Sequence, residues 1–166
     1  MSDENDLTRL SEQVGKRLKQ LKIMLVTAES CTGGWVAQEI TAIPGSSHWF
    51  DRGFVTYTNL SKQEMLGVSP ETLEDHGAVS EQTVHEMAEG ALQSSQAGVS
   101  VAISGIAGPG GGSEEKPVGT VWIAWAANNR VTRCKRELFT GDREQIRRQA
   151  VISALQGLLE MLEKHD

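Results

Sequence analysis

The sequence predicts a single α/β domain over residues 1–166, a three-layer α/β/α sandwich with a mixed sheet. Three observations favour this class. Helical and strand patterns alternate in the first part of the chain, which is typical of strands joined by helices. A hairpin pattern follows over 118–139, so part of the sheet should be antiparallel. A long amphipathic pattern closes the chain over 143–163, so helices can cover both faces of the sheet.

Apolar spacing defines the elements of the first half of the chain. Leucines and valines at helical spacing predict an amphipathic helix near the N-terminus, and short apolar runs predict strands. Gly33 or Gly34 opens a second helix, which stops before Pro44. The expected elements are a helix at 5–21, a strand at 23–27, a helix at 35–42 and a strand at 53–58.

Capping signals define the helices of the second half. Ser61 followed by Glu64 predicts a capping box that starts a short helix at 62–66. Ser69 followed by Pro70 starts a further short helix. The other expected elements are a helix at 80–95, a strand at 98–104, a hairpin of 118–127 with 131–139, and a helix at 143–163 capped by Asp142 with Gln145.

Composition and charge exclude several classes of partner. A chain of 166 residues can bury a sizeable core without a disulfide or a structural metal. The formal net charge of -6 argues against nucleic acid, and no apolar run approaches the roughly 20 residues that span a membrane. Cys31 and Cys134 make no paired spacing, and the N-terminus lacks a secretory pattern. We therefore expect a cytoplasmic protein that binds neither nucleic acid nor membrane.

The stretch TAESCTGG places nucleophiles where a strand gives way to a helix. Ligands of open α/β sheets bind at such strand ends, so Ser30 is the candidate nucleophile and Cys31 its competitor. Backbone N–H groups at a helix entrance can stabilise a developing oxyanion. Those expected to do so belong to Cys31, Thr32, Gly33 and Gly34. The alternative is that Ser30 or Thr32 is simply an N-cap.

A nucleophilic serine needs a base, and the sequence favours a lysine. None of the four histidines combines a strand-end position with an orienting acid or a metal-ligand spacing, so we expect no metal. Lys62 follows a strand and Tyr57, with apolar neighbours that could desolvate it. Desolvation makes the neutral amine accessible near neutral pH. The alternative is a solvated lysine on the first turn of a helix.

Two further features could hold an anion. The glycine-rich loop after residue 104 fits neither the Walker pattern nor the dinucleotide fingerprint, but it can bring backbone close to a ligand. Its alternative is a mobile surface loop. Arg143 and Arg147 share one face at the start of the last helix, where cations are disfavoured, so they could clamp a phosphate or carboxylate. Alternatively, Glu144 or Glu137 satisfies them.

Five stretches of the chain, taken in order, resemble the CinA carboxy-terminal domain family. They are TAESCTGG, GFVTYTNLSKQEMLGV, HGAVS, SGIAGPGGGSEEKPVGTV and GDRE. The likeness runs over about residues 7–160 and is strongest to the stand-alone members, the nicotinamide-nucleotide amidases. The resemblance implies an α/β/α sandwich that hydrolyses the amide of nicotinamide mononucleotide (NMN) to nicotinate mononucleotide and ammonia. It implies no cofactor.

The resemblance also implies roles for individual residues. Ser30 matches the nucleophile, Lys62 the base and Tyr57 an assisting hydroxyl. Arg143 matches a substrate-binding arginine, and Ser104 keeps the hydroxyl of a threonine found in some members. The full set expected at the substrate is Cys31, Thr32, Gly33, Gly34, Ser104, Gly105, Gly108, Gly110 and Arg143. We expect a homodimer. The alternative function is a nucleotide-binding regulatory module that performs no chemistry.

Overall fold

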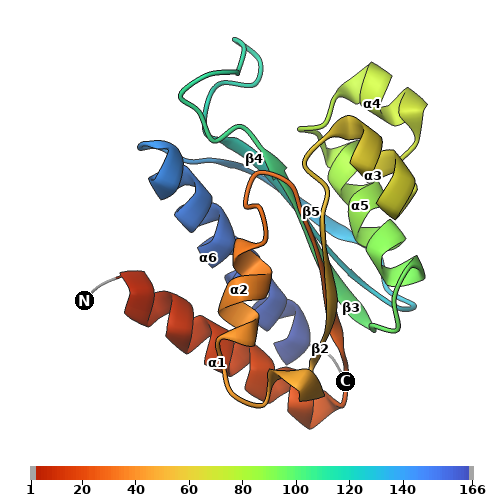
Figure 1. The fold of residues 1–166 in the computed structure, drawn as a ribbon, viewed down its shortest axis with the longest axis vertical. Coiled ribbons are helices and arrows are strands. Elements are labelled where there is room, and N and C mark those ends of the chain that lie inside the picture. The colour runs from red at the N-terminus through yellow and green to blue at the C-terminus, as the bar shows by residue number, and fades with distance from the viewer. Residues whose placement is uncertain (1–2, 165–166) are drawn as a thin grey trace.

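The structure is a computed structural model and describes residues 3–164. Within this range the chain forms a five-stranded sheet with helices on both faces (Figure 1). The strands are β1 (Leu25–Glu29), β2 (Phe50–Val55), β3 (Val99–Gly105), β4 (Thr120–Ala127) and β5 (Arg133–Leu138). The helices are α1 (Asp3–Leu21), α2 (Trp35–Thr41), the short 3-10 helix η1 (Ser46–His48), α3 (Asn59–Leu66), α4 (Pro70–His76), α5 (Glu81–Gln93) and α6 (Arg143–Glu163).

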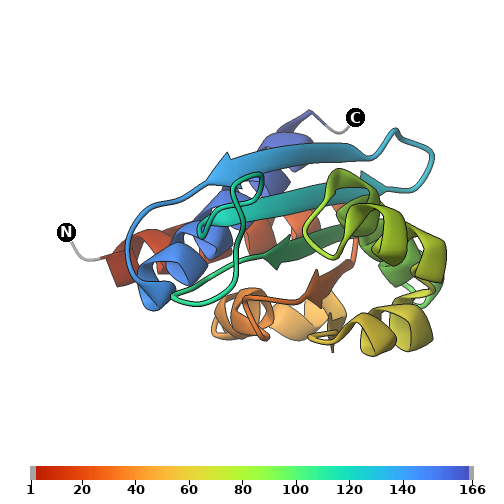
Figure 2. The same ribbon diagram turned by 90° about the horizontal axis from the view of Figure 1, so that it is seen from above.

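The sheet is mixed, as the sequence predicts. Its strand order is β2-β1-β3-β4-β5, with β1 parallel to both neighbours and β4 antiparallel to β3 and β5. Figure 2 shows the strands side by side, with β5 at one edge. The carboxyl end of β1 therefore lies between two parallel strands, which is where α/β proteins bind their ligands.

Helices cover both faces of the sheet and enclose a core on each. The helices α1, α2 and α6 lie on one face, and α3, α4 and α5 lie on the other (Figure 1). Successive residues of β3 point to opposite faces, so Val101 joins the core with Leu155 while Ala102 joins the core with Met87. No helix within residues 3–164 is long and apolar enough to cross a membrane.

The two predicted strands of the first half are present but displaced. β1 begins at Leu25 rather than at residue 23, because the Ile23 N–H still bonds the Leu18 carbonyl at the end of α1 (3.0 Å). β2 begins at Phe50 rather than at residue 53. Its second and third residues are charged, which is common on an edge strand and conceals the apolar pattern.

Of the two predicted capping boxes, one is confirmed and one is wrong. Asp142 and Gln145 exchange the expected hydrogen bonds at the start of α6. At α3 the box is formed by Thr58 with Ser61, not by Ser61 with Glu64. The helix consequently begins at Asn59, about one turn before Lys62. This earlier start decides where the lysine side chain points.

Candidate active site

Ser30 lies directly after the carboxyl end of β1, on a turn that leads into α2. Its N–H bonds the Ile103 carbonyl of the neighbouring parallel strand (2.9 Å), so the sheet fixes its backbone. Its residue surface is only 8% exposed. The turn closes through the Gly33 N–H, which donates to the Ser30 carbonyl (3.0 Å). The nucleophile predicted from the sequence is therefore held at a strand end, as expected.

Two glycines let the chain make this turn. Gly33 and Gly34 have φ values of 60° and 106°, in the left-handed region that L side chains avoid. Gly34 is the N-cap of α2, and no side chain caps the helix from that position. The interpretation of Ser30 or Thr32 as the N-cap is therefore wrong. Both residues have other partners.

Lys62 reaches Ser30 from the opposite wall of the site. The lysine is the fourth residue of α3, and it is only 1% exposed. Its Nζ lies 3.0 Å from Ser30 Oγ. It also lies 2.8 Å from the carbonyl oxygen of Thr56 and 3.2 Å from that of Tyr57. The alternative of a solvated lysine is wrong, and the serine and the amine are in direct contact.

Burial disfavours the charged forms of both Lys62 and Cys31, so it shifts their pKa values in opposite directions. It lowers the pKa of Lys62 to about 8, because the charged ammonium loses hydration. It raises the pKa of the Cys31 thiol to about 12, because the thiolate is the form that burial penalises. Near neutral pH the neutral amine is accessible and the thiolate is not. The geometry and the acidity therefore favour Ser30 over Cys31 as the nucleophile.

Glu29 is a site residue that the sequence reasoning missed. The last residue of β1, it is 1% exposed, yet its carboxylate has three donors. It accepts hydrogen bonds from Thr32 Oγ1 (2.6 Å) and from the N–H groups of Val36 (2.9 Å) and Ala37 (3.1 Å). Glu29 thus caps α2 from outside the helix. A carboxylate at the end of an apolar run was the available signal, since a buried charge requires partners.

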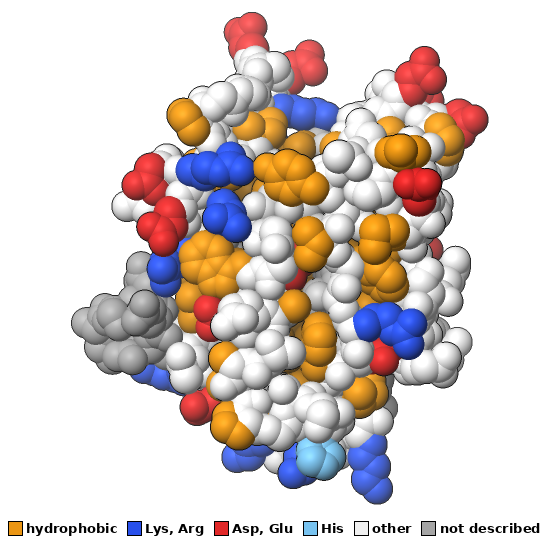
Figure 3. All heavy atoms as spheres, in the orientation of Figure 1, with side chains coloured by type: hydrophobic (Ala, Val, Ile, Leu, Met, Phe, Trp, Pro, Cys, Tyr) orange, Lys and Arg blue, Asp and Glu red, His pale blue; other side chains and the backbone are white. Residues whose placement is uncertain are grey.

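Arg143 and Arg147 of α6 bind different groups. Arg147 donates to the carbonyl oxygens of Cys31 (3.0 Å) and Thr32 (3.2 Å), so it holds the turn that carries Ser30. Arg143 donates to the Gly108 carbonyl (2.8 Å) and to the Tyr57 hydroxyl (3.0 Å). The alternative partners are occupied elsewhere, since Glu144 pairs with Arg148 and Glu137 with Lys135. Figure 3 shows Lys and Arg side chains gathered beside apolar ones over the first half of α6.

The remaining predicted residues lie around this centre at different depths. Ser104 is 1% exposed at the end of β3, next to β1 in the sheet. Gly108 is buried and held by Arg143, whereas Gly110 is exposed farther along the loop. Tyr57 is 59% exposed and links the two sides, because its carbonyl binds Lys62 and its hydroxyl binds Arg143. The structure thus brings together the turn, the lysine and Arg143.

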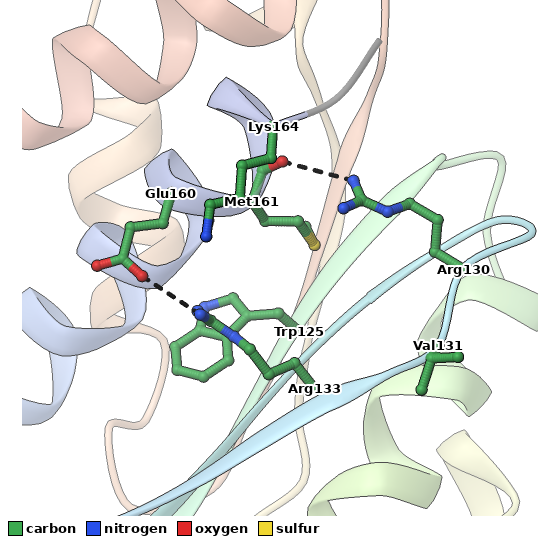
Figure 4. A pocket seen from close by; sticks show the side chains of 7 residues that line it. All are labelled: Trp125, Arg130, Val131, Arg133, Glu160, Met161 and Lys164. Atoms are coloured by element: carbon green, nitrogen blue, oxygen red, sulfur yellow. Dashed lines mark hydrogen bonds and ion pairs between the residues drawn. The ribbon is translucent and has the colours of Figure 1, made fainter.

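A separate cavity of about 210 Å³ lies between the β4–β5 hairpin and the end of α6 (Figure 4). Its walls are Trp125, Arg130, Val131, Arg133, Glu160, Met161 and Lys164. Arg133 stacks over the Trp125 ring at 4.5 Å and pairs with Glu160 at 3.3 Å. None of its lining residues belongs to the predicted site. Within residues 3–164, no group of three or more His, Cys, Asp or Glu side chains could hold a metal ion.

The fold and the site define an α/β/α protein in which a serine at a strand end is hydrogen-bonded to a buried lysine. Within that class, the chain belongs to the CinA C-terminal domain family, whose model matches residues 7–162. The family predicted from the sequence is confirmed.

Named relatives and solved structures support this membership. The chain is 59% identical to the nicotinamide-nucleotide amidohydrolase PncC of Escherichia coli K12, covering 93% of this chain and 94% of that protein. It is 50% identical to PncC of Pseudomonas putida, with 93% and 96% covered. Its fold is similar to the competence/damage inducible protein CihA of Agrobacterium tumefaciens, with a TM-score of 0.92, 48% identity and 96% of each chain covered. A competence damage-inducible protein A of Klebsiella pneumoniae gives a TM-score of 0.93 at 40% identity, covering 96% of this chain and 99% of that one.

Proposed function

We propose that this protein hydrolyses the carboxamide of NMN to nicotinate mononucleotide and ammonia, with Ser30 as the nucleophile. The names of the close relatives support the substrate, since they are nicotinamide-nucleotide amidohydrolases. The observation that carries the chemistry is the 3.0 Å contact between Lys62 Nζ and Ser30 Oγ. An amine so placed can remove the hydroxyl proton as the serine attacks.

The surroundings of Lys62 support its role as the base. A lysine ammonium has three N–H donors, and Nζ has three acceptors around it. When the amine is neutral, two N–H groups remain on the carbonyls of Thr56 and Tyr57. The lone pair then faces Ser30 Oγ and can accept its proton. The two main-chain carbonyls thus aim the base without taking part in the reaction.

The proposed reaction proceeds through an acyl-enzyme. Ser30 Oγ attacks the carboxamide carbon while Lys62 takes its proton, and a tetrahedral oxyanion forms. The protonated Lys62 then returns a proton to the nitrogen, the C–N bond breaks, and ammonia leaves. Water, deprotonated by the same amine, attacks the ester. Lys62 then returns this proton to Ser30 Oγ as the ester bond breaks, and nicotinate mononucleotide leaves. The Tyr57 hydroxyl, which accepts a hydrogen bond from Arg143, keeps its own proton available to assist the leaving nitrogen.

We assign the nucleotide portion of the substrate to Arg143 and the glycine-rich loop. Arg143 has five N–H donors, of which the Gly108 carbonyl and the Tyr57 hydroxyl take two. The remaining donors could bind a phosphate oxygen. Ser104 and the backbone at Gly105 lie at the adjacent end of β3, where they could contact the ribose or the pyridine ring.

Ammonia release from NMN tests the proposal. Purified protein, incubated with NMN and a chelator, should release one ammonia per nicotinate mononucleotide formed. Ser30→Ala should abolish the release, and Cys31→Ala should retain most of it. An active Ser30→Ala with an inactive Cys31→Ala would assign the reaction to the thiol. Binding of NMN without any ammonia would instead indicate the regulatory module.

A further inference from the structure

The N–H groups of the Ser30 turn are mostly engaged within the protein. The Gly33 N–H bonds the Ser30 carbonyl, and the Trp35 N–H bonds the Thr32 carbonyl, each at 3.0 Å. Glu29 takes the N–H groups at the start of α2. The N–H groups of the turn that have no acceptor among the described residues are those of Cys31, Thr32 and Gly34. An oxyanion donor must come from Cys31 or Gly34, since the Gly33 N–H is already used and Thr32 is fully buried.

Arg147 determines which way one of these peptide groups faces. Its guanidinium binds the Cys31 carbonyl at 3.0 Å and the Thr32 carbonyl at 3.2 Å. In a planar trans peptide the C=O and the following N–H point to opposite sides. The Thr32 N–H therefore points away from Arg147. The Gly33 N–H also points away from Arg147, and it donates a hydrogen bond to the Ser30 carbonyl. Of these two N–H groups, that of Thr32 has no acceptor within residues 3–164, but the residue is fully buried.

Thr32 is also fixed through its side chain. Its Oγ1 donates to the buried Glu29 carboxylate at 2.6 Å, and the residue is fully buried. With the carbonyls on both sides held by Arg147 and the side chain held by Glu29, the peptide cannot rotate without breaking charged hydrogen bonds.

We infer that Arg147 is a positioning residue that fixes the carbonyls of Cys31 and Thr32, and with them the turn that presents Ser30 Oγ to Lys62. This inference rests on the proposed amidase function. In this proposal Arg147 contacts neither the carboxamide nor the phosphate of NMN. It acts through the turn, and its absence should slow the chemical step while substrate binding stays the same.

The neighbouring Arg148 provides a matched control. Both guanidinium groups lie over the Trp35 ring, at 5.5 Å for Arg147 and 5.1 Å for Arg148. Arg148, however, pairs with Glu144 and does not bond the turn. Replacing either residue by Gln removes one positive charge and one ring contact from the same helix. Only the replacement at 147 releases the carbonyls of Cys31 and Thr32.

The experiment compares steady-state kinetics of Arg147→Gln and Arg148→Gln on NMN. A catalytic group misplaced by about 1 Å can cost about 10²-fold in rate, so loss of the contacts that hold the Ser30 turn should lower kcat by about 10–100-fold. KM should stay within about twofold, and Arg148→Gln should change neither constant by more than that. Guanidinium ion added to Arg147→Ala should restore part of kcat, which it would not do for a merely unfolded variant.

The outcomes separate this inference from the proposed function. If Arg147→Gln keeps wild-type kcat, or if Arg148→Gln loses as much, the inference is overturned while the amidase proposal stands. A raised KM with unchanged kcat would also overturn it, because Arg147 would then bind substrate directly. Should Arg147→Gln fail to fold, Arg147→Lys retains the charge over Trp35 and should show an intermediate kcat. A wild-type protein that releases no ammonia would instead refute the function itself.

Discussion

A lysine that is only 1% exposed is costly to keep charged, and Lys62 shows how this cost becomes useful. Burial lowers its pKa to about 8, which brings the neutral amine within reach near neutral pH. Cys31 is buried as well, but for a thiol the same effect raises the pKa to about 12 and suppresses reactivity. The same burial thus favours the neutral amine of Lys62 and the neutral thiol of Cys31.

The pKa of Lys62 predicts the pH dependence of the reaction. The base must be neutral, so only about a tenth of it is active at pH 7 when the pKa is about 8. We expect kcat/KM to rise about tenfold per pH unit below pH 8 and to level off above it. A pH–rate profile with NMN measures this directly.

Lys62→Arg is the control for that assignment. Arginine keeps its proton throughout this pH range, so it cannot act as a base. The variant should be slower by about 10²–10⁴-fold and should not recover at high pH. Lys135→Arg, on the exposed surface of β5, should keep the wild-type profile. A Lys62→Arg variant with the same rising limb would show that another group titrates.

At the scale of single residues, the strand-end position identified Ser30, and the apolar neighbours identified Lys62. The partners of Glu29 and Arg147 could not be predicted in the same way. Arg147 lies more than a hundred positions from the carbonyls that it binds, so the contact depends on how α6 packs. The sequence showed that Arg143 and Arg147 share a helix face. It could not show that Arg147 binds carbonyl oxygens of the Ser30 turn while Arg143 binds elsewhere.

At the scale of elements, the first N–H groups of α2 are capped by the carboxylate of Glu29, which precedes the helix in the sequence. Glu29→Gln keeps the shape of the side chain but replaces one acceptor oxygen by a donor, which must then face N–H or O–H groups. We expect the free energy of unfolding to fall by about 1–3 kcal/mol, measured by urea denaturation. Glu39→Gln on the same helix, which alters one partly exposed bond to Trp35, should cost less than about 1 kcal/mol. Equal losses would mean that Glu29 has no special role.

The position of α3 is set by close contact with α5. A Cβ at Gly90 would collide with the carbonyl oxygen of Leu66, at the end of the helix that carries Lys62. Gly90→Ala should therefore push α3 outward and lengthen the contact between Lys62 and Ser30. We expect kcat to fall by about tenfold or more, since small misplacement of a catalytic group is costly. Gln93→Ala, exposed on α5, should leave kcat unchanged.

The elements were easier to predict than their boundaries. Apolar spacing identified every strand and the long helices, because burial imposes periodicity. The start of α3 was wrong because Ser61 takes part in a capping box as its third helical residue, with Thr58 as the cap. Both interpretations use residues that commonly form caps, and only the packing of α3 on α5 distinguishes them.

For the molecule as a whole, the α/β class with a mixed sheet followed from the order of the patterns. The strand order β2-β1-β3-β4-β5 did not, because it depends on which helix crosses which face. That order places β1 between two parallel strands, and it brings α3 and α6 to opposite sides of the Ser30 turn.

A single domain should unfold in one transition. Two cores on one sheet, with Trp49 and Trp125 both buried on the same face, predict that fluorescence and far-UV circular dichroism change together. For a chain of this size, the heat capacity of unfolding should be about 2.0–2.5 kcal/mol/K. Two separate transitions would contradict the single domain. The midpoint should also rise with protein concentration if the chain is the homodimer that we expect.

The two carbonyl oxygens that hold the Lys62 amine have a consequence for redesign. They belong to the main chain, so the aim of the base does not depend on which side chains stand at 56 and 57. Tyr57 is largely exposed and offers a ring-sized variable surface at the mouth of the site. Substitution of Tyr57 by Phe would therefore remove the hydroxyl that binds Arg143, while the main-chain carbonyl that orients the Lys62 amine would stay in place.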